Sequence, residues 1–325
     1  MTVLITGAGL IGCAIAEGLA AQGKDVVLVD ICEPPALPPR TKFLAVDVTD
    51  AQAIDRAIVD HNVREIVHTA ALLSTAMRAD PVRGLSVNLL GTVNLLQACR
   101  HHGLRRIVLV SSTTVLYSGF ATLGPEPVPE DAALGLVSQR PGSLYAISKL
   151  TGEQLALLYR DLHGVDTISV RFGAVVGGRS DAPTSVPGRL FSTLVEAARN
   201  GRSIRIDDPF LIWKGKEEFV DVRDCARAAI CALETERAPL GVYNIVHPRQ
   251  WSLDEVIATV ADIYGPFSVS YDRTVSTGFA GFPHVRPAGS ATSKARDELG
   301  FSASHDLVDS LGYWWQSSAR ANRSM

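Results

Sequence analysis

The sequence lacks the cysteine and histidine patterns that mark zinc sites and disulfide frameworks. Its five cysteines include no Cys-x-x-Cys pair, and its eight histidines show no spacing typical of metal ligands. Several cysteines lie in apolar helical segments, where a reduced thiol behaves as a small hydrophobic residue. We therefore expect no metal site in this protein.

Basic tracts and long apolar runs are also missing. The net charge of the 325-residue chain is −3, and acidic and basic residues are mixed along it, so we expect neither nucleic acid nor a membrane surface as a partner. No apolar run approaches the roughly 18 residues that span a bilayer. The first residues, MTVLITGAGLIG, lack the basic residues of a signal peptide. These absences predict a cytoplasmic protein.

Short apolar segments alternate with helical patterns through the first half of the chain. We predict strands at residues 2–6, 25–30, 42–46, 65–71, 105–112 and 166–172, and helices at 10–22, 50–61, 80–102 and 143–163. Strands that are apolar throughout and separated by helices indicate a parallel sheet covered on both faces. The predicted fold class is α/β, with a Rossmann-type doubly wound parallel sheet.

The first predicted strand leads directly into a glycine-rich turn. Gly7, Gly9 and Gly12 stand at the mouth of the first helix, with Leu10 and Ile11 between the second and third glycine. Glycine permits unusual backbone angles, lets a pyrophosphate approach the main chain, and allows close packing of helix and sheet. The N–H groups at the helix start can then bind the phosphates. This motif predicts a dinucleotide site.

Asp30 strengthens this prediction because it ends the second strand, 18 residues after Gly12. A carboxylate at that place can bind the ribose hydroxyls of the adenosine. Ile31 and Cys32 follow it, and neither can pair with a 2′-phosphate. We therefore expect NAD rather than NADP as the cofactor.

Proline and glycine become frequent after residue 173, and the predicted helices at 187–200, 252–264 and 304–316 are joined by longer loops. This change predicts a second, smaller lobe. We assign residues 1–172 and 217–246 to the NAD-binding Rossmann domain. Residues 173–216 and 247–325 are assigned to a substrate-binding lobe, most of which is C-terminal.

A tyrosine and a lysine four residues apart, in the segment YAISK (145–149), lie on one face of a predicted helix. Together with SSTTVLY (111–117), HTAA (68–71), DVTD (47–50) and the glycine turn, this segment resembles the extended short-chain dehydrogenases/reductases. That group includes NAD-dependent epimerases and dehydratases. The glycine spacing here is one residue shorter than is usual in the family.

The resemblance implies further cofactor contacts along the chain. Asp47 and Val48 would flank the adenine, and Ala70 and Ala71 would lie under the cofactor at the end of the fourth strand. The remaining implied contacts are the internal asparagine of the long helix, Asn88, and the strand-end residue Ser111.

The resemblance also implies a catalytic set. Tyr145 would be the acid/base that acts on the substrate hydroxyl, and Lys149 would bind the nicotinamide ribose and lower the pKa of the phenol. Thr113 would orient the substrate oxygen, with Ser112 beside it. A homodimer formed through helices near 82–102 and 144–163 is implied as well.

Departures from the family pattern narrow the chemistry. Thr114 and Val115 stand where dehydratases carry an Asp-Glu pair, so dehydration is disfavoured. Nucleotide-sugar epimerases carry an asparagine where this chain has Ala174, and a diphosphate-binding arginine where it has Glu217. Arg286 matches a second arginine on the phosphate side and is a candidate substrate-binding residue.

Three functions stay open at this stage. The favoured function is an NAD-dependent dehydrogenase that oxidises a secondary alcohol of a sugar-like or other small polar substrate. An NAD-dependent UDP-hexose 4-epimerase is the alternative enzyme. An NAD-sensing scaffold is the alternative without catalysis, and the Thr113, Tyr145 and Lys149 set argues against it.

Overall fold

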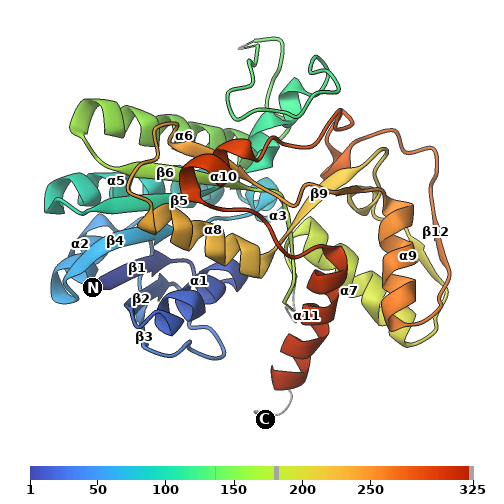
Figure 1. Ribbon diagram of the computed structural model, residues 1–325, viewed down its shortest axis with the longest axis horizontal. Coiled ribbons are helices and arrows are strands. Elements are labelled where there is room, and N and C mark those ends of the chain that lie inside the picture. Colours follow the sequence, from blue (N-terminus) through green and yellow to red (C-terminus); the bar gives the residue numbers. More distant parts are fainter. Residues whose placement is uncertain (136, 179–182, 322–325) are drawn as a thin grey trace.

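Seven parallel strands form the central sheet of the computed structural model, which describes residues 1–135, 137–178 and 183–321 (Figure 1). In spatial order the strands are β10 (Val242–Ile245), β6 (Thr167–Phe172), β5 (Arg106–Ser112), β4 (Val63–His68), β1 (Thr2–Thr6), β2 (Asp25–Asp30) and β3 (Thr41–Ala45). The strand order reverses between β1 and β4. In sheets of this kind, ligands bind outside the carboxyl ends of the strands at such a reversal.

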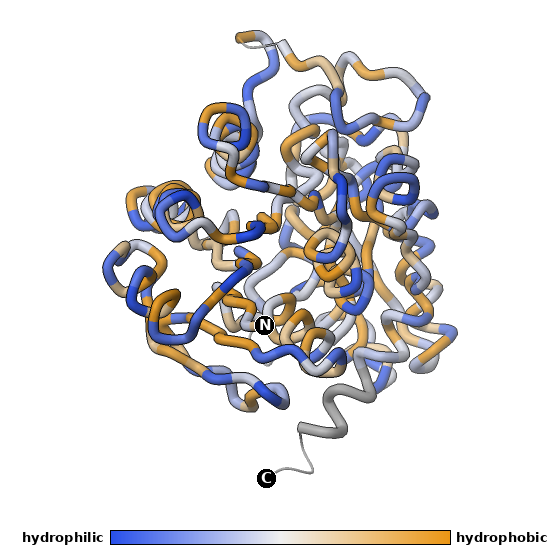
Figure 2. The backbone as a smooth tube through the Cα atoms, turned by 60° about the vertical axis from the view of Figure 1, so that its left-hand side comes forward, coloured by the Kyte–Doolittle hydropathy of each residue, from blue (hydrophilic) through white to orange (hydrophobic). Residues whose placement is uncertain are grey.

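Helices cover both faces of this sheet, as the apolar strands predict. One face carries α1 (Leu10–Ala21), α8 (Val222–Glu234) and α10 (Ser293–Leu299), and the other carries α2 (Ala51–Asp60), α5 (Gly91–His102) and α6 (Leu144–His163). In Figure 2 the central strands are mostly hydrophobic, whereas the covering helices alternate between hydrophobic and hydrophilic residues. The predicted Rossmann-type fold class is confirmed.

The long helix predicted at 80–102 is present but is not uniform. It follows α3 (Ser74–Ala79) and consists of α4 (Pro81–Leu85), a π-helical turn at Ser86–Leu90, and α5. Asp80 caps its start by accepting a hydrogen bond from the N–H of Arg83. The π turn contains Asn88, one of the predicted cofactor residues, and π turns inside α-helices are frequent at functional sites.

A smaller lobe lies beside the carboxyl ends of the central strands. It contains α7 (Val186–Arg199), α9 (Leu253–Tyr264), α11 (Leu307–Ala321), β7 (Ala174–Val176), β8 (Ile204–Ile206), β9 (Glu217–Asp221), β11 (Gln250–Trp251) and β12 (Val269–Tyr271). Its own hydrophobic core is rich in aromatic side chains, including Phe191, Trp213, Phe219 and Trp314.

The chain passes between the two parts more than once, and one strand differs from the expected assignment. The sequence places β9 with the Rossmann domain, but this strand pairs with β7 and β11 in a separate three-stranded sheet. Its partner strands belong to the lobe, and all five residues of β9 are buried. β10 and α8 do return to the central sheet.

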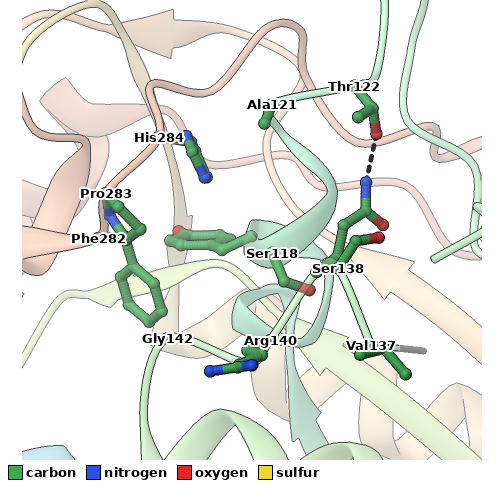
Figure 3. A pocket seen from close by; sticks show the side chains of 12 residues that line it. Ser118, Ala121, Thr122, Val137, Ser138, Arg140, Gly142, Phe282, Pro283 and His284 are labelled. Atoms are coloured by element: carbon green, nitrogen blue, oxygen red, sulfur yellow. Dashed lines mark hydrogen bonds between the residues drawn. The ribbon is translucent and has the colours of Figure 1, made fainter. Parts of the chain in front are cut away.

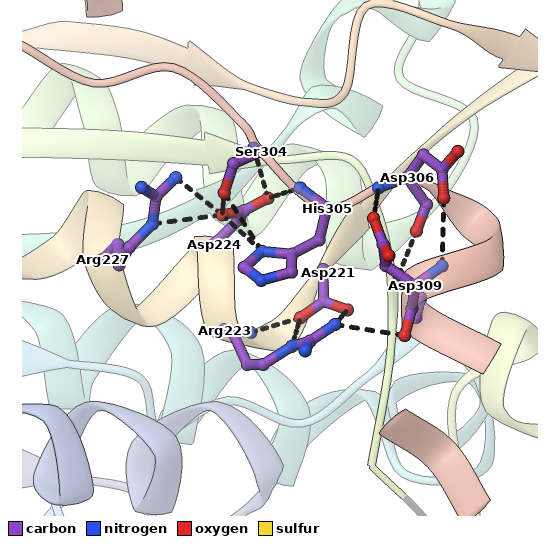
Figure 4. Close-up of polar contacts among 9 residues, drawn as sticks. Asp221, Arg223, Asp224, Arg227, Ser304, His305, Asp306 and Asp309 are labelled. Atoms are coloured by element: carbon purple, nitrogen blue, oxygen red, sulfur yellow. Dashed lines mark hydrogen bonds and ion pairs between the residues drawn. The ribbon is translucent and has the colours of Figure 1, made fainter. Parts of the chain in front are cut away.

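A buried aspartate on α8 forms hydrogen bonds with the segment that precedes α11 and so connects this segment to the Rossmann domain (Figure 4). Asp224 accepts hydrogen bonds from the backbone N–H groups of Ser304 and His305 and lies 2.7 Å from the guanidinium of Arg227. Burial would raise its pKa, but the hydrogen bonds from His305 and Ser304 hold the pKa below its usual range. The charged carboxylate therefore fixes the chain just before α11.

Within the described residues, no helix has both the length and the apolar character needed to cross a membrane. Those residues also contain no group of three or more His, Cys, Asp or Glu that could hold a metal ion.

Candidate active site

In the glycine turn after β1, Gly7 and Gly12 pack closely against the backbone, whereas the space around Gly9 is empty. Gly7 has φ +91°, and a Cβ added there would lie 2.7 Å from the backbone nitrogen of Ala70. A Cβ on Gly12 would collide with the carbonyl of Gly7, whereas a Cβ on Gly9 would meet nothing within 4 Å. Gly7 and Gly12 are therefore required for packing, and the space at Gly9 fits the approach of a pyrophosphate. Leu10, at the start of α1, is exposed beside it.

Asp30 lies directly beside this turn. Its Oδ2 accepts a hydrogen bond of 2.7 Å from the N–H of Ala8, and its Oδ1 accepts one of 3.2 Å from the N–H of Cys32. The carboxylate thus joins the end of β2 to the glycine turn. A 2′-phosphate at this place would meet a negative charge.

We expect Asp30→Ala to narrow the preference of the protein for NAD over NADP. The wild-type carboxylate accepts hydrogen bonds from a ribose diol but repels a 2′-phosphate, so the variant should bind NAD more weakly and NADP more tightly. Fluorescence titration of both cofactors measures this change. Asp25→Ala, at the other end of β2, is the control and should leave both affinities unchanged. Wild-type protein that binds NADP as tightly as NAD contradicts the assignment.

The predicted adenine-side residues lie at the carboxyl end of the sheet. Asp47 accepts hydrogen bonds from Thr49 and from the guanidinium of Arg83, the latter at 2.6 Å. Burial would raise the pKa of Asp47, but these hydrogen bonds hold it below its usual range. Val48 is buried, and its carbonyl accepts a hydrogen bond from Asn94.

Asn88 is held entirely by protein groups. Its Oδ1 accepts from the N–H of Leu72 at 2.8 Å, and its Nδ2 donates to the Leu72 carbonyl and to Ser148 Oγ, both at 3.1 Å. Asn88 therefore connects the loop that follows Ala70 and Ala71 to helix α6. The structure gives it a positioning role, because both polar atoms of its side chain are already bonded.

Tyr145 is the second residue of α6 and faces the end of β5. Burial raises the pKa of Tyr145 to about 12, and a side-chain hydrogen bond with Ser112 opposes this rise. Ser112 is the last residue of β5, and Thr113 begins the 3-10 helix Thr113–Gly119 with its side chain buried. The hydroxyl beside Tyr145 is thus that of Ser112.

Lys149 follows Tyr145 by one helical turn on the same face of α6. Its Nζ donates a hydrogen bond of 2.7 Å to the carbonyl of Val110 and lies 5.7 Å from the centre of the Tyr145 ring. Burial lowers the pKa of Lys149 to about 8, while the charge of Glu153 opposes this shift. The hydrogen bond with Ser112 acts to lower the pKa of the Tyr145 phenol.

Ser111, expected beside the cofactor, is bonded to the interior of the protein. Its hydroxyl donates to Glu153 Oε1 at 2.5 Å. Glu153 also forms a buried bidentate ion pair with Arg171, with N–O distances of 2.9 and 2.7 Å. This pair joins α6 to β6 and supports the helix that carries Tyr145 and Lys149.

Arg286 also differs from its expected role as a substrate ligand. Its Nε donates to Glu217 Oε1 at 2.7 Å, and its Nη2 lies 3.0 Å from Glu218 Oε1. The side chains of all three residues are only 1% exposed. Two neighbouring carboxylates hold the guanidinium inside the protein, which explains why it does not reach solvent.

His68, at the end of β4, is a site residue that sequence reasoning did not single out. Its ring nitrogens lie 2.7 Å from Thr6 Oγ1 and 3.0 Å from Thr92 Oγ1. Burial and, to a smaller extent, the charge of Lys149 lower the pKa of His68 to about 3. The imidazole is neutral and joins β1 to the long helix beneath the site. Its position in HTAA is the only signal that the sequence offers.

Comparisons with known proteins agree with this geometry. Residues 3–245 match the NAD-dependent epimerase/dehydratase family. An uncharacterised epimerase/dehydratase of Staphylococcus aureus strain MRSA252 is 28% identical over 316 residues, covering 94% of this chain and 93% of that protein.

Solved structures share the whole fold. The UDP-glucose 4-epimerase of Thermus thermophilus, determined with NAD, is 26% identical with a TM-score of 0.75, covering 99% of this chain and all of that one. A partial-consensus L-threonine 3-dehydrogenase is 22% identical with a TM-score of 0.76, covering 99% of each chain.

The match over three quarters of the chain confirms the resemblance seen in the sequence. The open space at Gly9 and the carboxylate of Asp30 fit the cofactor that the family description names. The chain therefore belongs to the NAD-dependent epimerase/dehydratase family, whose cofactor is NAD.

Proposed function

We propose that this protein is an NAD-dependent dehydrogenase that oxidises a secondary alcohol on a small polar substrate without a nucleotide diphosphate. Bound NAD supplies the hydride acceptor. Tyr145 removes the proton of the substrate hydroxyl, so that the carbinol carbon can release its hydride and become a carbonyl. Ser112 and Thr113 stand at the end of β5, where a hydroxyl can orient the reacting oxygen.

Lys149 supports this step from the same helix. A pKa of about 8 leaves its amine mostly charged at neutral pH, so it can donate hydrogen bonds to a ribose. The phenol of Tyr145, with a pKa of about 12, is protonated in the resting site. Oxidation should therefore become faster as the pH rises above neutrality, because the base form of Tyr145 becomes more abundant.

The buried cluster of Glu217, Glu218 and Arg286 is the observation that favours a substrate without a diphosphate. A diphosphate needs accessible cations, and the one arginine that matched such a role has its charge cancelled by two carboxylates. Burial raises the pKa of Glu217, although Arg286 acts against this rise. If Glu217 takes up a proton, the cluster becomes neutral, so neither charge state offers a net positive charge to a diphosphate.

A UDP-hexose 4-epimerase is the second candidate, because the Thermus thermophilus relative has that activity in its name. The two functions differ in what happens to NAD. A dehydrogenase releases NADH at each turnover, whereas an epimerase returns the hydride to its substrate.

We expect the purified protein to be largely free of NAD and to form NADH in proportion to a free polyol or sugar-acid substrate. It should not interconvert UDP-glucose and UDP-galactose. NADH absorbance, assay of NAD after heat extraction, and chromatography of the UDP-sugars measure these three properties. Retained NAD together with UDP-sugar interconversion would show that the epimerase is the correct function.

We also propose that the protein is a homodimer. Helix α6 exposes the apolar side chains of Ile147, Leu158 and Leu162, and the neighbouring π turn exposes Leu90. Exposed apolar side chains gathered on adjacent helices are typical of an interface. Sedimentation velocity tests this, and a species with the mass of one 34.8 kDa chain contradicts it.

A further inference from the structure

A pocket of about 540 Å³ opens between the 3-10 helix that follows β5 and the segment that precedes α6 (Figure 3). Its lining includes Tyr117, Ser118, Arg140, Gly142, Phe282 and His284. Its volume is in the range of small-molecule sites.

The pocket is built from the two elements that carry the reactive groups. Tyr117 and Ser118 belong to the 3-10 helix that starts at Thr113, directly after Ser112. Gly142 precedes Ser143, the N-cap of α6, and Tyr145 is the second residue of that helix. The pocket is therefore lined by residues that lie within a few positions of Ser112 and Tyr145 in the chain.

Apart from Tyr117, the ionisable side chains that line the pocket are all basic. Arg140 and His284 contribute basic side chains, and the lining contains no aspartate or glutamate. Among the described residues, neither of these two side chains takes part in a hydrogen bond or ion pair that would occupy it. The guanidinium of Arg286 lies 5.1 Å from the centre of the Tyr117 ring. The positive charge of Arg286 is cancelled by Glu217 and Glu218. Arg140 is thus the permanent cation that an anion in this pocket would meet.

The segment that carries Arg140 is held by its neighbour. The Gln139 side chain accepts a hydrogen bond of 2.6 Å from the N–H of Gly135 and donates one of 2.5 Å to Thr122 Oγ1. The bond to Thr122 is drawn in Figure 3. A guanidinium whose backbone is already held in place loses less conformational entropy on binding a planar anion than one on a mobile segment.

We propose that Arg140 binds a carboxylate of the substrate, so that the substrate is a hydroxy acid of the sugar-acid type. A guanidinium binds a carboxylate through two parallel hydrogen bonds, and the hydroxyls of Ser118 and Ser138 line the same pocket. This inference rests on the proposed dehydrogenase function, because the bound acid must present its hydroxyl to Tyr145.

The first test compares matched substrates of the full-length protein with NAD. Gluconate should be oxidised with a KM roughly 10–100-fold below that of sorbitol, its neutral counterpart, because a charge-assisted pair is lost with sorbitol. Arg140→Gln should remove this difference by raising the KM for gluconate, with kcat unchanged within about twofold. Arg140→Lys should recover part of it. Arg202→Gln, an exposed arginine outside the pocket, is the control and should behave as wild type.

The second test does not depend on turnover. Gluconate binding to the NAD-saturated Tyr145→Phe protein is measured by calorimetry, and Arg140→Gln added to this variant should weaken it by a similar factor. Absent turnover with intact, Arg140-dependent binding would refute the proposed reaction but keep this inference. Equal use of sorbitol, preference for sorbitol 6-phosphate, or binding that ignores Arg140→Gln overturns the carboxylate assignment.

Discussion

Tyr145→Phe should reduce turnover by roughly 100–10,000-fold while the affinity for NAD stays near the wild-type value. The change removes only the phenolic oxygen, which is the group that we propose takes the proton of the substrate hydroxyl. The ring keeps its place in α6, so the surface that binds NAD should be unchanged. Steady-state rates and fluorescence titration with NAD measure the two quantities. Tyr159→Phe, later in the same helix, is the matched control and should retain wild-type turnover.

The dependence on pH sharpens this experiment. In the wild type, the rate of oxidation should rise with pH because the phenol must lose its proton, and its pKa is raised to about 12 by burial. The residual rate of Tyr145→Phe should not follow this rise. A variant with near-normal turnover, or with the same pH profile as the wild type, would show that another group acts as the base.

Glu153→Ala should lower the free energy of unfolding by about 3–5 kcal/mol, because it leaves a buried charge on Arg171 without its partner. Both side chains are almost completely buried, at 1% and 6% exposure, and the carboxylate also accepts the hydroxyl of Ser111. Urea denaturation followed by circular dichroism measures the loss. Asp207→Ala breaks an exposed ion pair with Arg205 and should leave the midpoint nearly unchanged.

A double variant separates the lost charge pairing from lost packing. Glu153→Leu combined with Arg171→Met removes both charges and keeps most of the side-chain volume, so it should recover much of the stability lost in the single variant. If the double variant is less stable than Glu153→Ala, the remaining contact of Arg171 with the Glu130 carbonyl matters more than the charge pair.

The sheet, the glycine turn and helix α6 could be predicted because each depends on a local sequence pattern. The apolar runs of the central strands and the turn chemistry at Gly7 and Gly12 are visible within short windows of sequence. The placement of Asp30 beside that turn follows from the βαβ unit alone.

Features that depend on distant partners could not be predicted. The sequence suggests Arg286 as a substrate ligand. In the structure it is bonded to Glu217, 69 residues away, and no residue near Arg286 in the sequence indicates this contact. The same holds for Asn88, whose bonds to Leu72 and Ser148 arise only when the helix packs. Similarly, the hydrogen bond between Ser112 and Tyr145 forms only when α6 packs against the end of β5.

The late position of β10 in the chain bears on how the protein is synthesised. β6 is fully buried, but its outer neighbour β10 begins at Val242, roughly 70 residues after β6 ends at Phe172. At about 5–20 residues per second, the ribosome leaves this strand edge uncovered for several seconds. An unpaired strand edge can pair with other chains. We therefore expect nascent chains that stop before residue 242 to aggregate or to recruit chaperones, although they already contain the whole glycine turn and Tyr145.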